Sequence, residues 1–313
     1  MKYGIFHYDY PQLASENLDR FNLGDYIQSL AAKQYFPQVD RTFDRDCLDE
    51  LSHVADDYSV IVNGWYVMDN QRHIFNSNCL PVSIHINNVN ELTNGPCLES
   101  LKEIEPIGCR DLSTVKFLES QGIKAYFSSC LTTTLDKKYK YDGERSGVIY
   151  SDVDWLLKPG KLFPLNRWIK RTRICNRLKS FLNVYSNEPV SMISHIAPIN
   201  LTHNQRFEIA EDLINQYAKA KLVITSRIHA ALPCIALGTP VILVVEHYDN
   251  LRYQGLDDFL NHVWIRNGDL DIDVKLDDKG MVVNNNKHIP FAEKLKMQCE
   301  KWVSQQTGKE NES

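Results

Sequence analysis

Three side chains suited to anion binding and proton transfer follow an apolar run near residue 225. Residues 222–225 are apolar or β-branched, and Ser226, Arg227 and His229 come directly after them. Hydroxyl and guanidinium groups bind phosphate or carboxylate, and imidazole also transfers protons because it titrates near neutral pH. We therefore expect a site for an anionic ligand here, with His229 as the candidate proton donor.

The surrounding residues predict the elements that position this site. The runs 222–225 and 240–245 are typical of buried strands, and the largely apolar residues 228–237 between them are typical of a helix. We expect Ser226 to cap this helix and Gly238 to end it. A strand, helix, strand unit of this kind belongs to a parallel sheet, in which ligands bind at the carboxyl ends of the strands.

The charges at the start of this helix support an anion site. Arg227 and His229 are expected in the first turn, where the helix dipole disfavours cations by a few tenths to about 1 kcal/mol each. A bound anion would offset this cost by contacting the unpaired N–H groups and both side chains. In the alternative, Arg227 pairs with a structural carboxylate and His229 is a buried polar residue.

A polar turn near residue 22 provides a second candidate group. Asn22 and Gly24 are typical turn residues, and Asp25 places a carboxylate at the predicted start of a helix, where it is stabilised. Helix capping alone would account for Asp25. A role in binding or catalysis is equally open, because loops at the carboxyl edge of a sheet carry function.

Five further residues come at or near the ends of predicted strands. Asn63 and Trp65 follow a strand expected at 59–62, and the Trp65 ring could form an apolar wall against a sugar or pack between elements. Arg110 and Arg252 could contact an anion or pair with neighbouring aspartates. His195 is a second candidate proton donor.

Composition and length narrow the class of protein. The 313 residues are too many for one typical compact core and suggest two domains. The net charge of −5 predicts no general attraction to nucleic acid. No segment has the character of a signal peptide or membrane span, and the eight cysteines include no C-x-x-C pair. We expect a cytoplasmic protein with reduced thiols and no metal.

The alternation of predicted strands and helices indicates an α/β fold of two Rossmann-like domains with a cleft between them. Asp111 is expected to cap one of these helices. The polar stretch 136–145 is the expected linker. It divides a first domain, residues 1–140, from a second domain, residues 141–290. Residues 291–313 are expected to form a C-terminal helix and a tail that is disordered from residue 307.

One segment is strongly basic. Residues 158–179 contain eight lysines and arginines, no acidic residue and several interleaved apolar side chains. This composition is typical of a solvated helix that packs through its apolar stripe. The alternative is a peripheral contact with anionic lipid head groups at the inner face of a membrane.

The acidic triplet at 152–154 is attributed to a solvated loop rather than to a metal site.

Taken together, the short motifs of this chain resemble those of the polysaccharide pyruvyl transferases. The resemblance covers about residues 1–265 and implies a glycosyltransferase B arrangement of the two domains. The motifs are Asn22-x-Gly24-Asp25 with Gln28, Gly108-x-Arg110-Asp111, Ser129-Cys130-Leu131-Thr132, Ser226-Arg227-Ile228-His229-Ala230 and Gly238-x-Pro240.

The resemblance implies transfer of a pyruvate unit from phosphoenolpyruvate to a sugar as a ketal, without a cofactor. The first domain is expected on the acceptor side and the second on the phosphoenolpyruvate side. The sugar would belong to a capsular, exo- or cell-wall polysaccharide or to its precursor, including a lipid-linked one. The catalytic candidates are His229, Arg227 and Asp25. The candidates for binding phosphoenolpyruvate are Ser226, Arg227, His229, Arg110 and Arg252. The candidates for binding the acceptor are Asn22, Gly24, Asp25, Asn63 and Trp65.

Two other functions are compatible with the same residues. A glycosyltransferase B enzyme would use the helix start near Arg227 to bind the diphosphate of a nucleotide sugar. A sugar-binding protein of the same fold would have lost the chemistry. Protection by phosphoenolpyruvate or by a nucleotide sugar distinguishes the two enzymes. The sequence indicates neither the acceptor sugar nor the oligomeric state.

Overall fold

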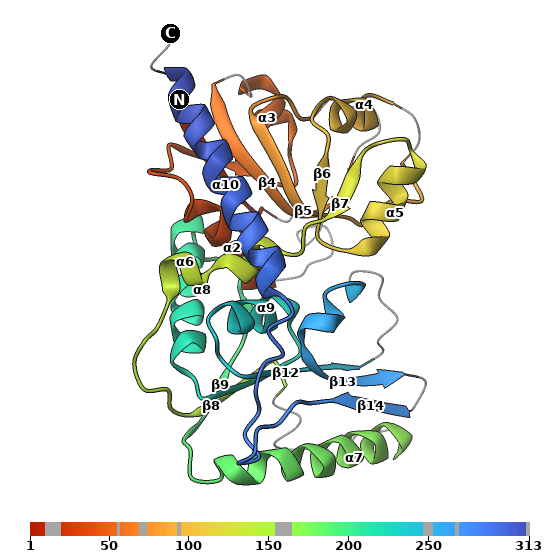
Figure 1. The fold of residues 1–313 in the computed structure, drawn as a ribbon, viewed down its shortest axis with the longest axis vertical. Helices are drawn as coiled ribbons and strands as arrows, with labels where there is room; N and C mark the ends of the chain where they lie inside the picture. The colour runs from red at the N-terminus through yellow and green to blue at the C-terminus, as the bar shows by residue number, and fades with distance from the viewer. Residues whose placement is uncertain are drawn as a thin grey trace.

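The computed structural model shows an α/β protein with two six-stranded sheets. Figure 1 shows one sheet above the other, with helices between them. No helix among the described residues is long and apolar enough to cross a membrane. The structure describes residues 1–9, 20–54, 57–68, 74–92, 95–153, 165–246, 253–266 and 269–310.

The first sheet is wholly parallel, in the order β3-β1-β4-β5-β6-β7. Its central strands are buried on both faces, which explains their apolar composition. The strands are β1 Lys2–His7, β3 Arg41–Asp44, β4 Tyr58–Tyr66, β5 Cys79–Ile86, β6 Ile107–Cys109 and β7 Ala125–Phe127.

The second sheet has the order β14-β13-β12-β11-β8-β9 and is parallel except for the β13–β14 pair. Its strands are β8 Val148–Ser151, β9 Val190–Ile193, β11 Leu222–Thr225, β12 Val241–Glu246, β13 Asn261–Arg266 and β14 Asp269–Asp273. A short antiparallel ladder of β2 Arg20–Asn22 and β10 Ile196–Pro198 connects the two halves of the molecule.

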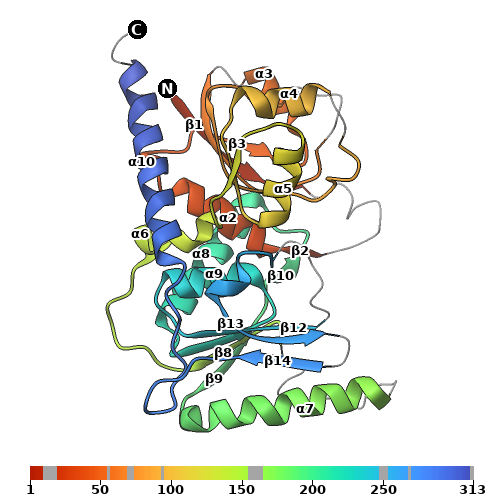
Figure 2. The ribbon, with the colours of Figure 1, turned by 45° about the vertical axis from the view of Figure 1, so that its right-hand side comes forward.

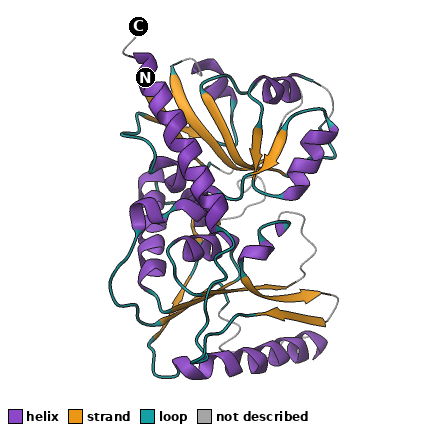
Figure 3. Cartoon of the chain, viewed as in Figure 1, coloured by secondary structure: helices purple, strands orange, loops and turns teal. Residues whose placement is uncertain are grey.

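Three helices pack together between the sheets, and Figure 3 shows helices gathered there. These are α2, α8 and α9, and they share one apolar core with both sheets. The helices of the described chain are α2 Leu23–Lys33, α3 Asp49–Val54, α4 Pro96–Glu103, α5 Leu112–Ser120, α6 Asp136–Tyr139, α7 Leu165–Leu182, α8 His203–Lys219, α9 Ile228–Ala236 and α10 Ile289–Glu310.

The last helix, α10, returns from the second half of the chain to the first sheet, as Figures 1 and 2 show. Near its start Phe291 packs on Phe127 and Phe259, and near its end the Thr307 hydroxyl lies 3.0 Å from that of Tyr3. These contacts explain why the helix continues to residue 310, although the tail from residue 307 was expected to be disordered.

The structure confirms the expected α/β fold with two Rossmann-like halves. The domain limits at residues 140 and 290 stay a prediction. Strands β2, β3, β10, β13 and β14 were not predicted. The first three are short and are defined by pairing with distant partners, whereas β13 and β14 pair with each other at the edge of the second sheet. The strand expected at 59–62 continues to Tyr66 after a bulge between Val62 and Gly64.

Candidate functional site

The starts of α2 and α9 meet at a close contact between Gly24 and His229. A Cβ atom on residue 24 would lie 3.1 Å from the His229 Cβ and 3.3 Å from its Nδ1. These separations are tighter than ordinary van der Waals contact, so a larger side chain would force the two helices apart. Gly24 therefore allows the two halves of the molecule to approach at His229.

Arg110 joins this contact from the carboxyl end of β6. Its side chain is almost completely buried, and its Nη1 lies 3.2 Å from the Gln28 Oε1 and 3.4 Å from the His229 Nε2. Because a guanidinium only donates hydrogen bonds, His229 accepts through Nε2 in this arrangement. The carboxyl ends of β6 and β11 thus face each other across the boundary between the halves.

Asp25 belongs to the same network through Gln28. The Gln28 Nε2 donates to the Asp25 Oδ1 at 3.0 Å, while the Gln28 Oε1 accepts from Arg110. One amide side chain therefore holds a carboxylate and a guanidinium at a fixed spacing. Gln28 is part of the motifs quoted above, but it was not predicted as a site residue.

Asn22 and Asn63 support α2 rather than face this network. Asn22 is the N-cap of α2 and accepts a hydrogen bond from the Gly24 N–H at 3.1 Å. Asn63 is buried in β4 and donates from Nδ2 to the Gln28 carbonyl at 3.0 Å. Its expected place beyond the end of a strand was wrong, because β4 continues past it after a bulge.

Trp65 packs against a buried arginine. The Arg45 guanidinium lies 5.2 Å from the centre of the Trp65 ring and 4.8 Å from that of Tyr8. The Arg45 Nη1 also donates to the Trp65 carbonyl at 2.6 Å. This is the packing arrangement weighed above for Trp65, with a guanidinium rather than a sugar against its ring.

Ser226 and Arg227 lie at the start of α9 and are both held by Asp152. The Arg227 Nε donates to the Asp152 Oδ2 at 2.8 Å, and the Ser226 hydroxyl donates to the Asp152 carbonyl at 3.0 Å. The N-cap of α9 is Arg227, without a side-chain capping bond, so the expected cap at Ser226 was wrong. The Ser226 hydroxyl instead donates to Asp152, the residue directly after β8.

Asp152 was not predicted to belong to this site. Burial would raise the pKa of this carboxyl, but hydrogen bonds from Ser194 and His195 and the charge of Arg227 hold the pKa below its usual range. Asp152 is therefore ionised at neutral pH. The signal for it was present, because Asp152 follows β8, the strand beside β11.

Arg227 keeps donors for a second anion. Of its side-chain nitrogens, only Nε makes a hydrogen bond with the described residues, and the side chain is 35% exposed. Arg227 thus pairs with a structural carboxylate, as the alternative above expected. This pair uses Nε and not the two Nη groups. Arg252 lies outside the described residues.

His195 is buried beneath this site. Its Nε2 lies 2.6 Å from the Tyr217 hydroxyl, and its carbonyl accepts from the Leu23 N–H at 2.7 Å. Burial lowers the pKa of His195 to about 4, although Asp152 acts in the opposite direction. The His195 ring is neutral at pH 7 and fully buried, whereas His229 is 6% exposed and contacts Arg110 between the halves, which favours His229 as the proton donor.

A second buried pair was also missed. The His85 Nδ1 lies 2.6 Å from the Asp111 Oδ2, and Asp111 caps α5 by accepting from the Thr114 N–H at 3.0 Å. The cap at Asp111 was predicted and is confirmed. His85 could have been noticed, because it lies near the carboxyl end of β5, next to β6 in the sheet.

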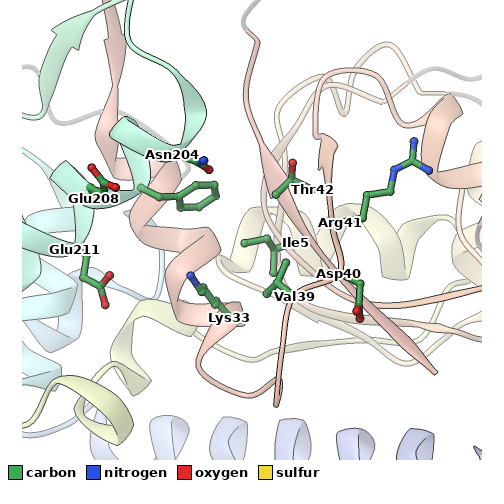
Figure 4. A pocket seen from close by; sticks show the side chains of 10 residues that line it. Ile5, Lys33, Val39, Asp40, Arg41, Thr42, Asn204, Glu208 and Glu211 are labelled. Atoms are coloured by element: carbon green, nitrogen blue, oxygen red, sulfur yellow. The ribbon is translucent and has the colours of Figure 1, made fainter.

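A separate cavity of about 420 Å³ lies between the edge of the first sheet and α8. Figure 4 shows Lys33, Glu208 and Glu211 on one side of it and Asp40 and Arg41 across from them. None of the predicted site residues lines this cavity. Charged side chains of both signs line it, so it offers no concentrated positive charge to an anion.

Comparisons with known proteins give one informative match. A family model described as polysaccharide pyruvyl transferase matches residues 22–248. No curated protein sequence matches. One similar crystal structure, of a candidate UDP-N-acetylglucosamine 2-epimerase from Listeria monocytogenes, is 10% identical, covers 82% of each chain and has a TM-score of 0.36. That likeness is too low to carry an argument about activity.

The burial of neutral His195 predicts a pH dependence of stability. The ordinary pKa of 6.5 applies in the unfolded chain, so between pH 6.5 and about 4 the unfolded chain binds the extra proton. Stability should therefore fall as the pH is lowered through this window. We expect His195→Gln to show a shallower fall than the wild type when urea unfolding is measured from pH 7 to pH 4. Parallel curves would contradict this account of His195.

Proposed function

Because this chain belongs to the polysaccharide pyruvyl transferase family, we propose that it transfers a pyruvate unit from phosphoenolpyruvate to a saccharide acceptor and forms a ketal. The observation that carries the proposal is the meeting of Arg110, His229 and Gly24 where the two halves face each other. Arg227, on the same helix start as His229, adds a second guanidinium.

Phosphoenolpyruvate carries a phosphate and a carboxylate, and the site offers two guanidinium groups for them. Arg110 presents a buried guanidinium from the first half, and Arg227 presents its two Nη groups from the second half. Guanidinium groups bind both anions in a bidentate manner. The N–H groups at the start of α9 add further donors. In this proposal the donor lies between the halves and contacts both.

His229 is proposed as the acid that starts the reaction. A proton passes from the imidazolium to the methylene carbon of phosphoenolpyruvate, and C2 becomes electrophilic. Without ligand, the His229 Nε2 accepts from Arg110, so protonation there would place two cations together. Bound phosphoenolpyruvate supplies the negative charge that stabilises the imidazolium beside Arg110.

The acceptor then reacts twice at C2. One sugar hydroxyl attacks C2 and loses its proton, and the C2–O bond to phosphate breaks. A second hydroxyl of the same sugar attacks C2, loses its proton and closes the ketal. Asp25 lies in the first half of the site, where Gln28 holds it near Arg110. It is proposed to accept the proton of a sugar hydroxyl.

The remaining predicted residues receive supporting roles. Asn22 and Gly24 form the start of α2, and Asn63 holds the Gln28 backbone, so these residues position Asp25 and Gln28. Ser226 is proposed to fix the start of α9 through β8. Trp65, whose ring contacts the Arg45 guanidinium, is proposed to have a packing role. Direct contact of Arg252 with the donor stays a prediction.

The lipid contact that was the alternative for residues 158–179 is not needed for this proposal. In α7, Cys175 and Leu178 are buried, whereas Arg173 and Lys179 are exposed. A solvated helix has the same arrangement, and we assign this role to α7. A lipid-linked acceptor and a contact with the inner face of a membrane stay predictions. Pelleting with anionic vesicles, but not with neutral vesicles, would support them.

Two substitutions test the donor half of the site. We expect His229→Gln and Arg227→Ala each to lower the transfer rate by about a hundredfold or more, because one removes the acid and the other an anion contact. The assay follows acceptor-dependent phosphate release from phosphoenolpyruvate across a panel of saccharides. His53→Gln and Arg173→Ala change exposed residues of the same types and should retain activity. Wild-type rates in His229→Gln would exclude its role as the acid.

Asp25→Asn tests the acceptor half. The asparagine can still accept from Gln28, so the network should remain while the base is lost. We expect kcat to fall by about tenfold to a thousandfold with little change in the KM for phosphoenolpyruvate. A rise in that KM at constant kcat would instead assign Asp25 to donor binding.

A further inference from the structure

Two histidines and an aspartate meet where β1 ends and α8 begins. His7 is the last residue of β1, Asp9 follows it closely, and His203 is the first residue of α8. The His203 Nε2 lies 3.1 Å from the Asp9 Oδ1, and the His7 Nε2 lies 3.7 Å from the Asp9 Oδ2. One ligand atom from each residue lies within 4.8 Å of the other two. This spacing is compact enough for one cation to contact all three.

The hydrogen bonds of Tyr26 are compatible with the His203 tautomer that presents Nε2 to this cluster as an acceptor. The Tyr26 hydroxyl donates to the Tyr8 carbonyl at 3.3 Å, so its oxygen accepts from the other neighbours. These are the Arg206 Nη1 at 3.1 Å and the His203 Nδ1 at 2.8 Å. With its proton on Nδ1, His203 directs the Nε2 lone pair toward Asp9.

In this tautomer the Nε2 lone pair and the Asp9 carboxylate oxygen, 3.1 Å apart, can both be ligands of one cation. Metal-binding histidines commonly have this arrangement, with one nitrogen toward the metal and the other donating to an oxygen. Tyr26 provides the outer oxygen here. The Asp9 side chain is 57% exposed, so a cation can enter from solvent.

We propose that His7, Asp9 and His203 bind a divalent transition-metal ion, with zinc as the best match. Two imidazoles and one carboxylate suit zinc and its neighbours, whereas magnesium and calcium prefer oxygen ligands. Three protein ligands leave one tetrahedral position for water. The sequence predicted no metal, because His203 is far from the other two ligands in the chain.

The metal would link the two halves of the molecule. His7 ends a strand of the first sheet and Asp9 follows it, whereas His203 opens the helix that precedes β11 of the second sheet. Binding to the folded chain alone stabilises it in proportion to the logarithm of the metal concentration. Metal binding can therefore be measured as a change in the stability of the folded protein, independently of pyruvyl transfer.

The test is a calorimetric titration of the untagged, EDTA-dialysed full-length protein with zinc chloride, together with thermal unfolding. We expect one zinc per chain and a higher melting temperature. Asp9→Ala and His203→Gln should each weaken zinc binding by more than about tenfold and remove the thermal shift. Asp142→Ala and His53→Gln, which change exposed residues of the same types, should bind as the wild type does.

Cys47 needs its own control, because it is the exposed cysteine of the chain and thiolates also bind zinc. Cys47→Ser should bind zinc as the wild type does. Circular dichroism checks that each variant is folded, and Asp9→Ala decides the question if His203→Gln does not fold. The proposal is wrong if the wild type takes up no zinc, if folded Asp9→Ala binds it normally, or if Cys47→Ser alone abolishes binding.

Discussion

The arrangement of this protein depends on the close approach of Gly24 to His229. That contact brings the starts of α2 and α9 together, although these helices belong to different halves of the molecule. It also fixes the distance between His229 of the second half and Arg110 of the first half, which Gln28 holds in place. Because packed helices resist small displacements, a change at Gly24 would move the acidic and basic groups of the site relative to one another.

Electrostatics then determine what this arrangement can bind. Arg227 is oriented by ionised Asp152, and Arg110 is buried beside the neutral side chain of Gln28 and the ring of His229. Two guanidinium groups and a helix start in one region favour an anion with two charged ends. The same anion would favour the protonated form of His229. Binding of the donor and preparation of the acid are therefore linked in this account.

Local patterns predicted those parts of the site that depend on neighbours in the chain. The strand before Ser226, the helix after it and the cap at Asp111 follow from short runs of residues. The partner of Arg227 could not be predicted in this way, since Asp152 reaches it through the order of strands in the sheet. The meeting of Arg110 with His229 depends on how the two halves pack, which no short pattern encodes.

The most direct test of the anion site is calorimetric titration of the wild type and of Arg227→Ala with phosphoenolpyruvate and, separately, with a panel of nucleotide sugars. The account predicts that phosphoenolpyruvate binds the wild type and that Arg227→Ala weakens this binding by about tenfold or more, as expected for loss of a charged hydrogen bond. Binding of a nucleotide sugar without binding of phosphoenolpyruvate would contradict it. In that case the site would belong to a glycosyl donor.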